Sequence, residues 1–351
     1  MQIQILRDII GFNALAQEWN ALHQNSASPV PFLRHEYLST WWQTLGGGEW
    51  PEGELYVVTA RHANGSLAGI APLFLTHNRD GLPALMLLGS IEISDYLDLI
   101  ARPDELPAFL DALLDHLASP SAPAWQVLDW YNLLDSSPTL LALAETVAKR
   151  GWLLAQEPLQ HCPYIALPGD WEKYLAEQVD KKQRHEIRRK MRRIEELNDR
   201  SDSAHQPVRW YIVQDEASLD LEIDAFLQLM ANDPEKANFL TGAMRAQMHL
   251  AAHAAISAGW LQLSFLEVNG EKAAGYLNFD YDNHIWVYNS GLDFRFREYS
   301  PGWVLLGYLL QWANEHRRGI FDFMRGDEDY KYKFGAIDRR VLRVIIQRAA
   351  A

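Results

Sequence analysis

The pattern of hydrophobic and polar positions divides the first half of the chain into alternating strands and helices. Residues 2–7 are typical of a short strand, and apolar residues at helical spacing follow in 8–23 and 34–45. Two alternating runs then flank Asn64-Gly65, a pair that supplies the positive φ angles of a tight hairpin turn. Further strands are predicted near 84–89, 96–100, 125–131 and 152–157, with helices near 104–118 and 137–150. This mixture predicts an α/β fold.

The second half repeats the arrangement. Residues 261–269 and 272–281 flank Asn269-Gly270 as a second hairpin, and an Ala-Gly pair follows each Asn-Gly turn at a nearly equal distance. Helices are predicted at 216–231, 239–258 and 302–317, and strands at 319–323 and 340–347. We interpret the repetition as a duplication. It predicts an N-terminal domain over 1–167 and a C-terminal domain over 170–351, divided at a turn-rich run.

A long helix over 171–198, followed by a polar loop over 199–207, is predicted between the halves. Its apolar stripe is narrow, and residues 181–193 hold eight Lys or Arg and one Glu, although the whole chain has a net charge of -14. The basic run is either a solvated face, a contact with an acidic face of the same protein, or a site for a phosphorylated ligand such as CoA, a nucleotide-linked sugar, a lipid diphosphate or tRNA. Arg184 and Arg188, one turn apart, are our candidates for substrate contacts.

Composition and motifs narrow the chemistry. Cys162 is the sole cysteine, so an internal disulfide and a Cys-based metal cluster are excluded. The chain has no His-Glu-x-x-His zinc motif and no Gly-x-Ser-x-Gly nucleophile elbow, and we expect no metal. The N-terminus lacks the pattern of a secretion signal and no apolar stretch is long enough to span a bilayer, so we expect a cytoplasmic protein. The oligomeric state is left open.

Four segments together resemble a known family. They are Ser94-Asp95-Tyr96-Leu97-Asp98, the basic run 181–193, Tyr299-Ser300-Pro301-Gly302, and the block FDFMRGDEDYKYKFG at 321–335. The combination resembles the bacterial GNAT-like acyltransferases associated with cellulose biosynthesis proteins (the CelD type), which are relatives of the Fem peptidyltransferases. The resemblance spans nearly the whole chain, and its specific part is the block at 321–335.

The resemblance implies tandem GNAT-like domains, each with a mixed, mostly antiparallel sheet flanked by helices, and transfer of an acyl group to an amine. The implied donor is acetyl-CoA or another acyl-CoA in ordinary GNAT enzymes, and aminoacyl-tRNA in the Fem branch; we favour acyl-CoA. The family's pyrophosphate loop reads Arg/Gln-x-x-Gly-x-Gly/Ala, whereas here Arg297 leads to Gly302 through Glu-Tyr-Ser-Pro, without the first glycine. Arg297, Ser300 and Gly302 are the candidates for cofactor binding. Ser300-Pro301 also suits an ordinary helix start.

Direct attack of an amine on an acyl donor requires stabilisation of the oxyanion and a proton for the leaving group. Polar residues that follow the short strand at 319–323 lie where α/β folds place ligands. Lys331 is our candidate for neutralising the oxyanion or a phosphate, and Tyr330 for protonating the leaving group. Arg325 either contacts substrate or pairs with a neighbouring aspartate. A solvated charged loop is the alternative for this whole segment.

Strand alternation in 96–100 places Tyr96 and Asp98 on one face, as candidates for substrate binding, while Asp95 orients the acceptor amine or takes its proton. Aspartate capping a loop is the alternative. Our leading hypothesis is an N-acyltransferase that acts on a small-molecule, glycan-linked or lipid-linked amine in cell-envelope or polysaccharide metabolism. The alternatives are an aminoacyl-tRNA-dependent, Fem-like transferase and a non-catalytic GNAT scaffold that binds an anionic glycan or lipid precursor.

Overall fold

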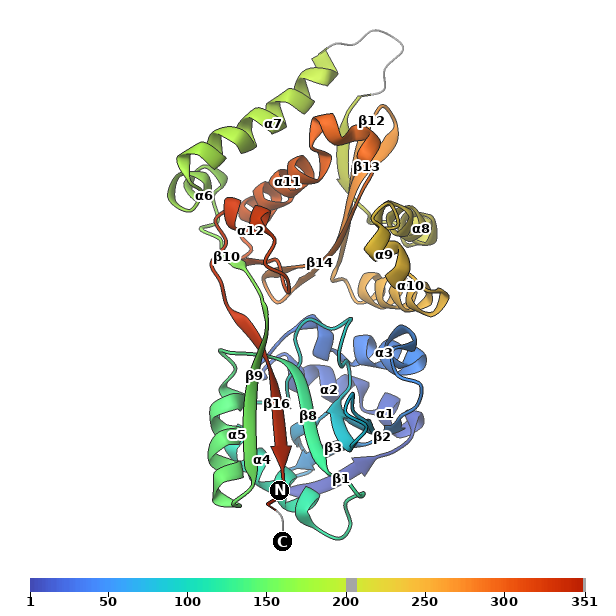
Figure 1. Cartoon of the computed structure of the whole chain (residues 1–351), viewed down its shortest axis with the longest axis vertical. Helices are drawn as coiled ribbons and strands as arrows, with labels where there is room; N and C mark the ends of the chain where they lie inside the picture. The colour runs from blue at the N-terminus through green and yellow to red at the C-terminus, as the bar shows by residue number, and fades with distance from the viewer. Residues whose placement is uncertain (200–206, 350–351) are drawn as a thin grey trace. The chain divides into compact units, whose positions relative to one another are not determined.

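The computed structural model describes residues 1–199 and 207–349, and the chain forms two compact units. The first comprises Met1–Gln160 with the C-terminal stretch from Arg339, and the second comprises His161–Asp338. In Figure 1 the last strand, drawn in red, runs beside the green strands of the first unit. The boundary expected at 167–170 therefore falls inside the second unit, and the strand expected at 340–347 joins the first. The loop expected at 199–207 lies almost wholly outside the described residues.

The first unit contains two sheets. One is antiparallel with the order β1-β3-β4-β7, and the other has the order β2-β5-β6-β8-β16-β9, in which β6 and β8 are parallel. The bounds are β1 (Gln2–Leu6), β2 (Glu54–Leu55), β3 (Val57–Arg61), β4 (Leu67–Ala71), β5 (Leu73–His77), β6 (Pro83–Leu87), β7 (Ile100–Ala101), β8 (Val127–Leu134), β9 (Leu153–His161) and β16 (Arg340–Gln347). The strand expected at 96–100 is thus reduced to the two residues of β7.

The first hairpin forms at the expected turn, where Gly65 has a φ of 85° between β3 and β4. Its second arm is then divided, because β4 and β5 belong to different sheets. Pro72 separates them, and proline has no N–H to donate to a strand ladder. The carbonyl of Pro72 accepts a hydrogen bond from the Leu88 N–H at 2.7 Å, which fixes the corner.

The helices of the first unit match the apolar periodicity. They are α1 (Ile9–Ala14), α2 (Ala16–His23), η1 (Pro31–Leu33), α3 (His35–Gly48), α4 (Leu106–Ala118) and α5 (Pro138–Lys149). The largest side chains in the core of this unit are aromatic, and Trp19, Trp41 and Trp130 are fully buried. Each such ring removes roughly 150–250 Å² of mostly apolar surface from water, so these residues dominate the packing.

The second unit is built on one sheet with the order β10-β15-β14-β13-β12-β11. Neighbouring strands in this sheet are antiparallel except β14 and β15, which are parallel. The strands are β10 (Tyr164–Ala166), β11 (Arg209–Ile212), β12 (Leu261–Val268), β13 (Glu271–Tyr281), β14 (His284–Leu292) and β15 (Ile320–Asp322). The expected hairpin at Asn269-Gly270 joins β12 and β13, and both turn residues have positive φ. The fold class expected from the sequence is confirmed.

Helices cover both faces of this sheet, as Figure 1 shows. They are α6 (Trp171–Glu177), α7 (Lys181–Asp199), η2 (Glu216–Ser218), α8 (Leu219–Met230), α9 (Pro234–Phe239), α10 (Gly242–Ser257), η3 (Phe294–Tyr299), α11 (Pro301–Glu315) and α12 (Asp329–Lys333). Successive side chains along β13 point alternately to the helices on the two faces of the sheet. Ala274 and Tyr276 belong to the core that α6, α7 and α11 complete, whereas a Cβ at Gly275 would lie 3.0 Å from Phe226 of α8.

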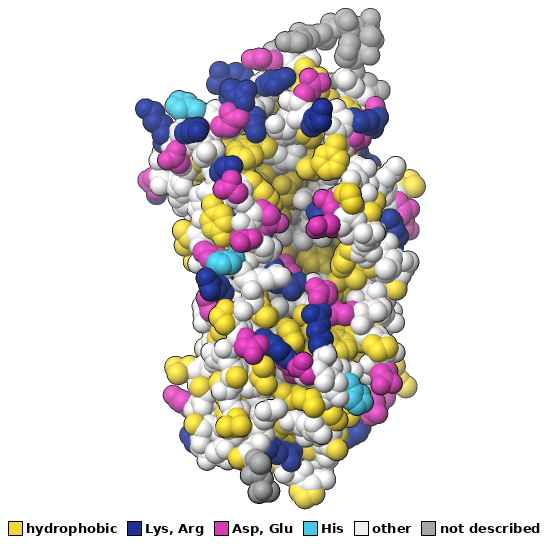
Figure 2. All heavy atoms as spheres, in the orientation of Figure 1, with side chains coloured by type: hydrophobic (Ala, Val, Ile, Leu, Met, Phe, Trp, Pro, Cys, Tyr) yellow, Lys and Arg dark blue, Asp and Glu magenta, His cyan; other side chains and the backbone are white. Residues whose placement is uncertain are grey.

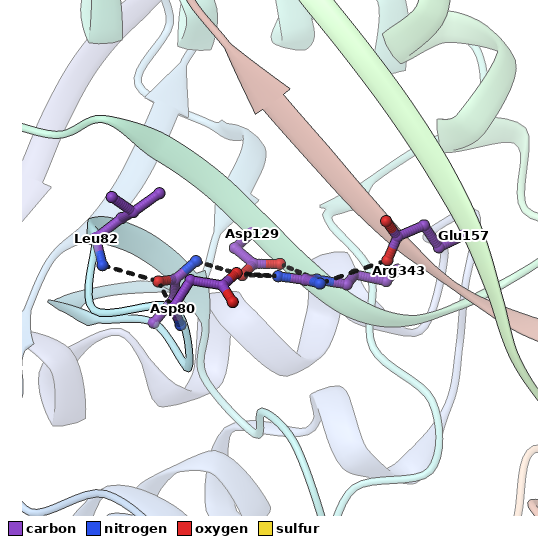
Figure 3. Close-up of polar contacts among 6 residues, drawn as sticks. Asp80, Leu82, Asp129, Glu157 and Arg343 are labelled. Carbon is purple, nitrogen blue, oxygen red and sulfur yellow. Dashed lines mark hydrogen bonds and ion pairs between the residues drawn. The ribbon is translucent and has the colours of Figure 1, made fainter.

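Strand β16 fixes its place in the first unit through Arg343 (Figure 3). The Nε of Arg343 donates to Asp129 Oδ1 and one terminal nitrogen to Oδ2, both at 2.8 Å, and Asp129 is fully buried in β8. Asn78 also donates to Asp129 at 2.9 Å. Asp80 and Glu157 lie 3.3 and 3.4 Å from the guanidinium. A buried carboxylate requires such a partner, so the C-terminal strand supplies a charge that the first unit needs.

Candidate functional site

A mostly apolar pocket of about 380 Å³ lies in the second unit where β14 and β15 part. Parallel pairing joins only His284–Trp286 of β14 to Ile320–Asp322 of β15. Beyond Trp286, β14 continues to Leu292 and pairs, among the described strands, with β13 alone. The lining residues come from β13, β14, the turn into α11, and α12: Tyr276, Ser290, Leu292, Asp293, Phe294, Arg297, Ser300, Pro301, Gly302, Trp303, Leu306 and Tyr330.

The turn into α11 forms one wall of the pocket. Ser300 stands at the N-cap, as its sequence context suggested, but it adopts φ 51° and ψ 52° and its side chain does not cap the helix. A left-handed conformation is uncommon for a residue other than glycine. The first N–H groups of α11 are left without a capping serine, and together with the helix dipole they favour an anion at this end.

Packing alone requires glycine at position 302, whether or not a ligand binds there. A Cβ on this residue would lie 2.6 Å from Cδ2 of Leu292, so glycine lets α11 approach the end of β14 closely. The hydroxyl of Tyr276 lies 3.4 Å from the carbonyl oxygen of Gly302, to which it donates a long hydrogen bond. The helix start is thereby held against the sheet at the pocket wall.

Arg297 contributes a positive charge to the pocket lining. It is exposed, it lines the pocket, and among the described residues no carboxylate lies within ion-pair distance of it. Arg295, two residues earlier, provides a contrast because it is bound to Asp293 and Glu271 at 2.7 and 2.6 Å and lies outside the pocket lining. The sequence prediction that Arg297 contacts an anionic cofactor is compatible with this geometry and stays a prediction.

Two tyrosines close the pocket from the sheet and from α12. Burial raises the pKa of Tyr330 well above 10, with further contributions from Tyr276 and Glu328, and burial raises the pKa of Tyr276 as well. Both phenols therefore keep their protons at neutral pH. Within the described part of the chain no group forms a hydrogen bond with the hydroxyl of Tyr330, so this donor is available to a ligand.

Lys331, our candidate for neutralising the oxyanion or a phosphate, is buried and is not among the lining residues of the pocket. Its side chain is only 4% exposed, and Nζ donates to the carbonyl oxygens of Phe323, Arg325 and Gly326 at 3.0 to 3.2 Å. Nζ also lies 2.9 Å from Glu328. Three N–H groups thus face four protein acceptors. The ammonium stabilises the loop between β15 and α12, because it donates hydrogen bonds to three carbonyl oxygens of that loop.

Two neighbours show how that loop is built. Gly326 has a φ of 110°, and a Cβ there would lie 2.5 Å from Glu328 and 3.1 Å from the Lys331 ammonium. Glycine is therefore required for the loop to close around the lysine. Arg325 is half-buried, contributes its carbonyl oxygen to Lys331, and is not among the pocket lining residues. A substrate contact by its side chain stays a prediction.

The predicted helix over 171–198 is two helices. Asp180 separates α6 from α7 and accepts a hydrogen bond from the backbone N–H of Lys182 at 2.9 Å, as a residue before a helix does. The predicted apolar stripe of α7 is confirmed, since Ile187, Met191 and Ile194 are buried in the core of the unit. A close approach of α7 to α11 is made at Gly307, where a Cβ would lie 3.0 Å from Sδ of Met191.

The basic side chains of α7 form a cluster that Figure 2 shows in dark blue. Some of them have acidic partners: Arg188 pairs with Glu172, Arg189 and Lys190 with Glu186, and Arg193 with Glu298. Among the described residues no acidic partner is found for Lys181, Lys182, Arg184 and Arg192. The Nε of Arg184 is also buried without a hydrogen-bond acceptor. The two candidates from the sequence are thus distinguished, because Arg188 is paired and Arg184 is not.

The basic helix adjoins the pocket. Nζ of Lys190 lies 4.2 Å from the ring centre of Trp303, and Trp303 is a lining residue of the pocket. Burial lowers the pKa of Lys190, although the neighbouring Glu186 opposes this shift. The basic helix therefore supplies a positive charge at the pocket wall that Trp303 forms.

Asp95, Tyr96 and Asp98 lie in the first unit, outside any strand. The expectation that alternation places Tyr96 and Asp98 on one face is wrong, because β7 begins only at Ile100. Asp98 is 1% exposed and accepts hydrogen bonds from Ser28, from Ser137 at 2.5 Å and from the Leu99 N–H at 2.7 Å.

These buried hydrogen bonds give Asp98 a structural role, because they occupy the carboxylate that we expected to bind substrate. Burial raises the pKa of Asp98, against these hydrogen bonds. Tyr96 is buried too, with Arg339 over its ring at 5.2 Å. Asp95 is half-buried, and its predicted role with the acceptor amine stays a prediction.

Sequence reasoning missed more than half of the lining residues, and Tyr276, Leu292 and Trp303 are among them. The signal for Tyr276 was present, because it follows the Ala-Gly pair of the second hairpin on the face opposite Gly275. The strand that carries Leu292 was not predicted at all. Without β14 the sequence offers no indication that Leu292 and Gly302 lie close together.

Comparison with known proteins finds a family match within the second unit. Residues 181–332 match the family described as Acetyltransferase (GNAT) domain. The second unit contains a GNAT domain. The matched segment includes α7, the whole sheet from β11 to β15, and the pocket. A search of curated protein sequences gives no match.

Solved structures show the same fold over nearly the whole chain. A structure of FemX has a TM-score of 0.66 at 10% identity and covers 98% of this chain and 97% of its own. A conserved protein of unknown function from Bacteroides thetaiotaomicron has a TM-score of 0.63 at 12% identity, with coverages of 99% and 100%. The C-terminal domain of a putative lysylphosphatidylglycerol synthetase from Agrobacterium fabrum has a TM-score of 0.58 at 10% identity, with coverages of 96% and 92%. In the described ranges, no helix combines the length and apolar character needed to cross a membrane.

Proposed function

We propose that the chain is an N-acyltransferase whose acyl donor, an acyl-CoA, binds in the pocket at the start of α11. One observation carries the proposal. Arg297, Ser300, Gly302 and Tyr330, which the sequence marked as cofactor-binding or catalytic, all line one pocket inside the segment that matches a GNAT domain. The apolar remainder of the lining suits an acyl chain or the pantetheine arm, and the helix start with Arg297 suits phosphate oxygens.

In the proposed reaction the amine nitrogen attacks the carbonyl carbon of the thioester, the carbon–sulfur bond breaks, and the thiol leaves. In this proposal the hydroxyl of Tyr330 donates a hydrogen bond to the oxyanion or to the leaving sulfur. Because the pKa of Tyr330 is raised well above 10, the phenol is a weaker acid than a thiol of pKa about 8.5. We therefore assign Tyr330 a stabilising hydrogen bond, and the proton lost by the amine is the one that reaches the sulfur.

The acceptor is proposed from the resemblance found in the sequence. The CelD-type resemblance supports an amine of cell-envelope or polysaccharide metabolism, used in the cytoplasm. The fold shared with FemX and with a putative lysylphosphatidylglycerol synthetase domain is compatible with this class of acceptor and does not identify it.

A second candidate is an aminoacyl-tRNA-dependent transferase. The observation that favours it is the basic cluster of α7, in which Lys181, Lys182, Arg184 and Arg192 have no acidic partner among the described residues. Such cations gain most from a polyanion, whose condensed counterions they release. The contact of Lys190 with Trp303 places this helix beside the proposed acyl site.

The test is a binding and turnover experiment on the full chain. Thermal shift with acetyl-CoA and longer acyl-CoAs measures binding, and release of free thiol in the presence of a panel of amines measures transfer. Arg297→Ala should weaken acyl-CoA binding about tenfold or more, whereas the matched Arg295→Ala, whose side chain is already paired with Glu271 and Asp293 and does not line the pocket, should have a much smaller effect. Equal effects of both substitutions would contradict the site. Binding without thiol release for any amine would favour the non-catalytic scaffold.

A further inference from the structure

A row of histidines on α10 faces a row of aspartates on α8, on the sheet face opposite to α11. Asp220 and Asp224 are one helical turn apart, as are His249 and His253. The two helices run antiparallel along this row, because Ser257 contacts Glu216, His253 contacts Asp220, and His249 contacts Asp224. The spacing of four residues repeats on both helices, so the side chains meet in register.

Three of these side chains converge on one point. Oδ1 of Asp220 lies 2.8 Å from Nε2 of His253 and 3.3 Å from Nδ1 of His249. One ligand atom from each of the three residues falls within 4.8 Å of the other two. A tetrahedral Zn²⁺ ion with bonds of about 2.0–2.1 Å holds its ligand atoms roughly 3.4 Å apart, so small side-chain rotations suffice.

We propose that Asp220, His249 and His253 bind one divalent transition-metal ion, Zn²⁺ above all, across α8 and α10. Imidazole nitrogen and carboxylate oxygen are the ligands that Zn²⁺ takes in the absence of cysteine. Three protein ligands leave the fourth position to water. The three side chains are 71%, 26% and 40% exposed in that order, so the ion enters from solvent.

Asp224 supplies an independent observation in favour of a metal. Nε2 of His249, the nitrogen on the far side of the ring from Asp220, lies 3.0 Å from Oδ1 of Asp224. A histidine that binds metal through one nitrogen commonly donates its other N–H to a carboxylate, which fixes the tautomer and strengthens the ligand. Here the ring is already oriented in that way, with Nδ1 turned towards Asp220 and Nε2 towards Asp224.

The surroundings of Asp220 also suit a ligand, because its Oδ1 lies 2.8 Å from Nε2 of His253 and 3.3 Å from Nδ1 of His249. Without an ion the same residues form exposed ion pairs, which contribute little to stability. Both imidazoles lie next to the same oxygen of Asp220. A metal ion bound there would be coordinated by all three side chains at once, whereas a proton is shared by only two groups.

The ion would brace a helix pair against the sheet that carries the pocket. α8 packs closely on β14, where a Cβ at Gly291 would lie 2.5 Å from the backbone nitrogen of Met230. Gly291 stands between Ser290 and Leu292, two lining residues of the pocket. The proposal nevertheless does not depend on acyl transfer, because its ligands belong to α8 and α10 alone.

The experiment is calorimetric titration of the chelator-treated full chain with Zn²⁺, and with Co²⁺ to report ligand geometry by its visible spectrum. We expect one ion per chain, a raised melting temperature, and a tetrahedral Co²⁺ spectrum. His249→Ala and His253→Ala should each weaken binding about 100-fold or more. Asp224→Asn should weaken it roughly 10–100-fold, as loss of an outer partner does.

The matched control is His77→Ala, since His77 is an exposed histidine beside a single carboxylate, Glu52, at 3.9 Å. This variant should bind Zn²⁺ like the unmodified chain. Circular dichroism of the metal-free variants checks that each is folded. The proposal is overturned if the unmodified chain binds no ion at one equivalent, or if His249→Ala and His253→Ala bind as tightly as His77→Ala.

Discussion

At the scale of single residues, Tyr330 carries the sharpest prediction about chemistry. Tyr330→Phe removes one hydroxyl and keeps the ring that packs in the core, so turnover should fall by a factor on the order of 100 while the melting temperature changes little. Tyr332→Phe is the control, because Tyr332 lies on the same helix, exposed and outside the pocket lining. Release of thiol by both variants is measured. Unchanged turnover in Tyr330→Phe would remove this residue from the mechanism.

Lys331 leads to a prediction about stability. Lys331→Ala leaves three carbonyl oxygens without their donor in a buried loop, which should lower the free energy of unfolding by about 1–3 kcal/mol. Lys333→Ala should have almost no effect, because Lys333 is 40% exposed and forms a surface pair with Asp329. Thermal melting compares the two. A stable Lys331→Ala variant with strongly reduced turnover would restore the catalytic role that the sequence suggested.

His23 predicts a dependence of stability on pH. Burial lowers its pKa from 6.5 to about 4, and its side chain is fully buried in the first unit. Between these two values the unfolded chain binds more protons than the folded chain, so the stabilisation is complete above pH 6.5 and is lost as the pH falls towards 4. The loss amounts to about 3 kcal/mol. His23→Gln should flatten this part of the pH profile in denaturant titrations, and the exposed His77→Gln should not.

The contrast between Tyr330 and Lys331 shows what the sequence can predict at this scale. The pattern located the block 321–335 and the turn at Ser300-Pro301-Gly302, and the structure brings residues of both to one pocket. The sequence could not predict which of the two side chains points into the pocket. That depends on the positive φ of Gly326, which lets the loop close over the lysine. Asp98 was misjudged for a similar reason. Its partners Ser28 and Ser137 are far away in sequence.

At the scale of elements, periodicity predicted most helices and both Asn-Gly hairpins, and failed where strands are short or irregular. The two-residue β7 was overestimated, and β10, β11 and β14 were not predicted. Strand β14 has a register shift between its pairs with Leu277 and Asn278 of β13, which interrupts the alternation that sequence analysis relies on. The pocket lies beside that strand, so its walls could not be completed from the sequence.

The basic helix α7 gives a prediction at this scale. Replacing the unpaired Arg184 and Arg192 together by alanine should weaken binding of CoA or tRNA about tenfold or more, and the loss should shrink at high salt. Replacing Arg188 and Arg189, which already have glutamate partners, should have a smaller effect on binding. Affinities at low and high salt compare the two double variants. Equal losses would mean that only net charge matters. No loss for either would indicate a solvated face.

At the scale of the whole molecule, the chain order and the units do not coincide. The strand at 340–347 was predicted as part of the C-terminal domain over 170–351, yet it pairs with β8 in the first unit. Strand order within a sheet is a long-range property, and no local pattern in β16 distinguishes the two sheets. Arg343 favours the first unit, because its guanidinium binds the buried carboxylate of Asp129 there.

Truncation tests this arrangement. A chain that ends at Asp338 loses β16, so β8 is left with an unpaired apolar edge and Asp129 is left without its cation. The first unit should then fail to fold cooperatively, and the protein should aggregate or lose one of its melting transitions. Arg343→Met in the full chain should reproduce the electrostatic part, lowering the free energy of unfolding by about 3–5 kcal/mol. A chain that ends at Arg348 is the control, because it keeps all of β16 and should melt as the full chain does. If the chain ending at Asp338 melts like the full chain, then β16 is dispensable and the first unit is complete at Gln160.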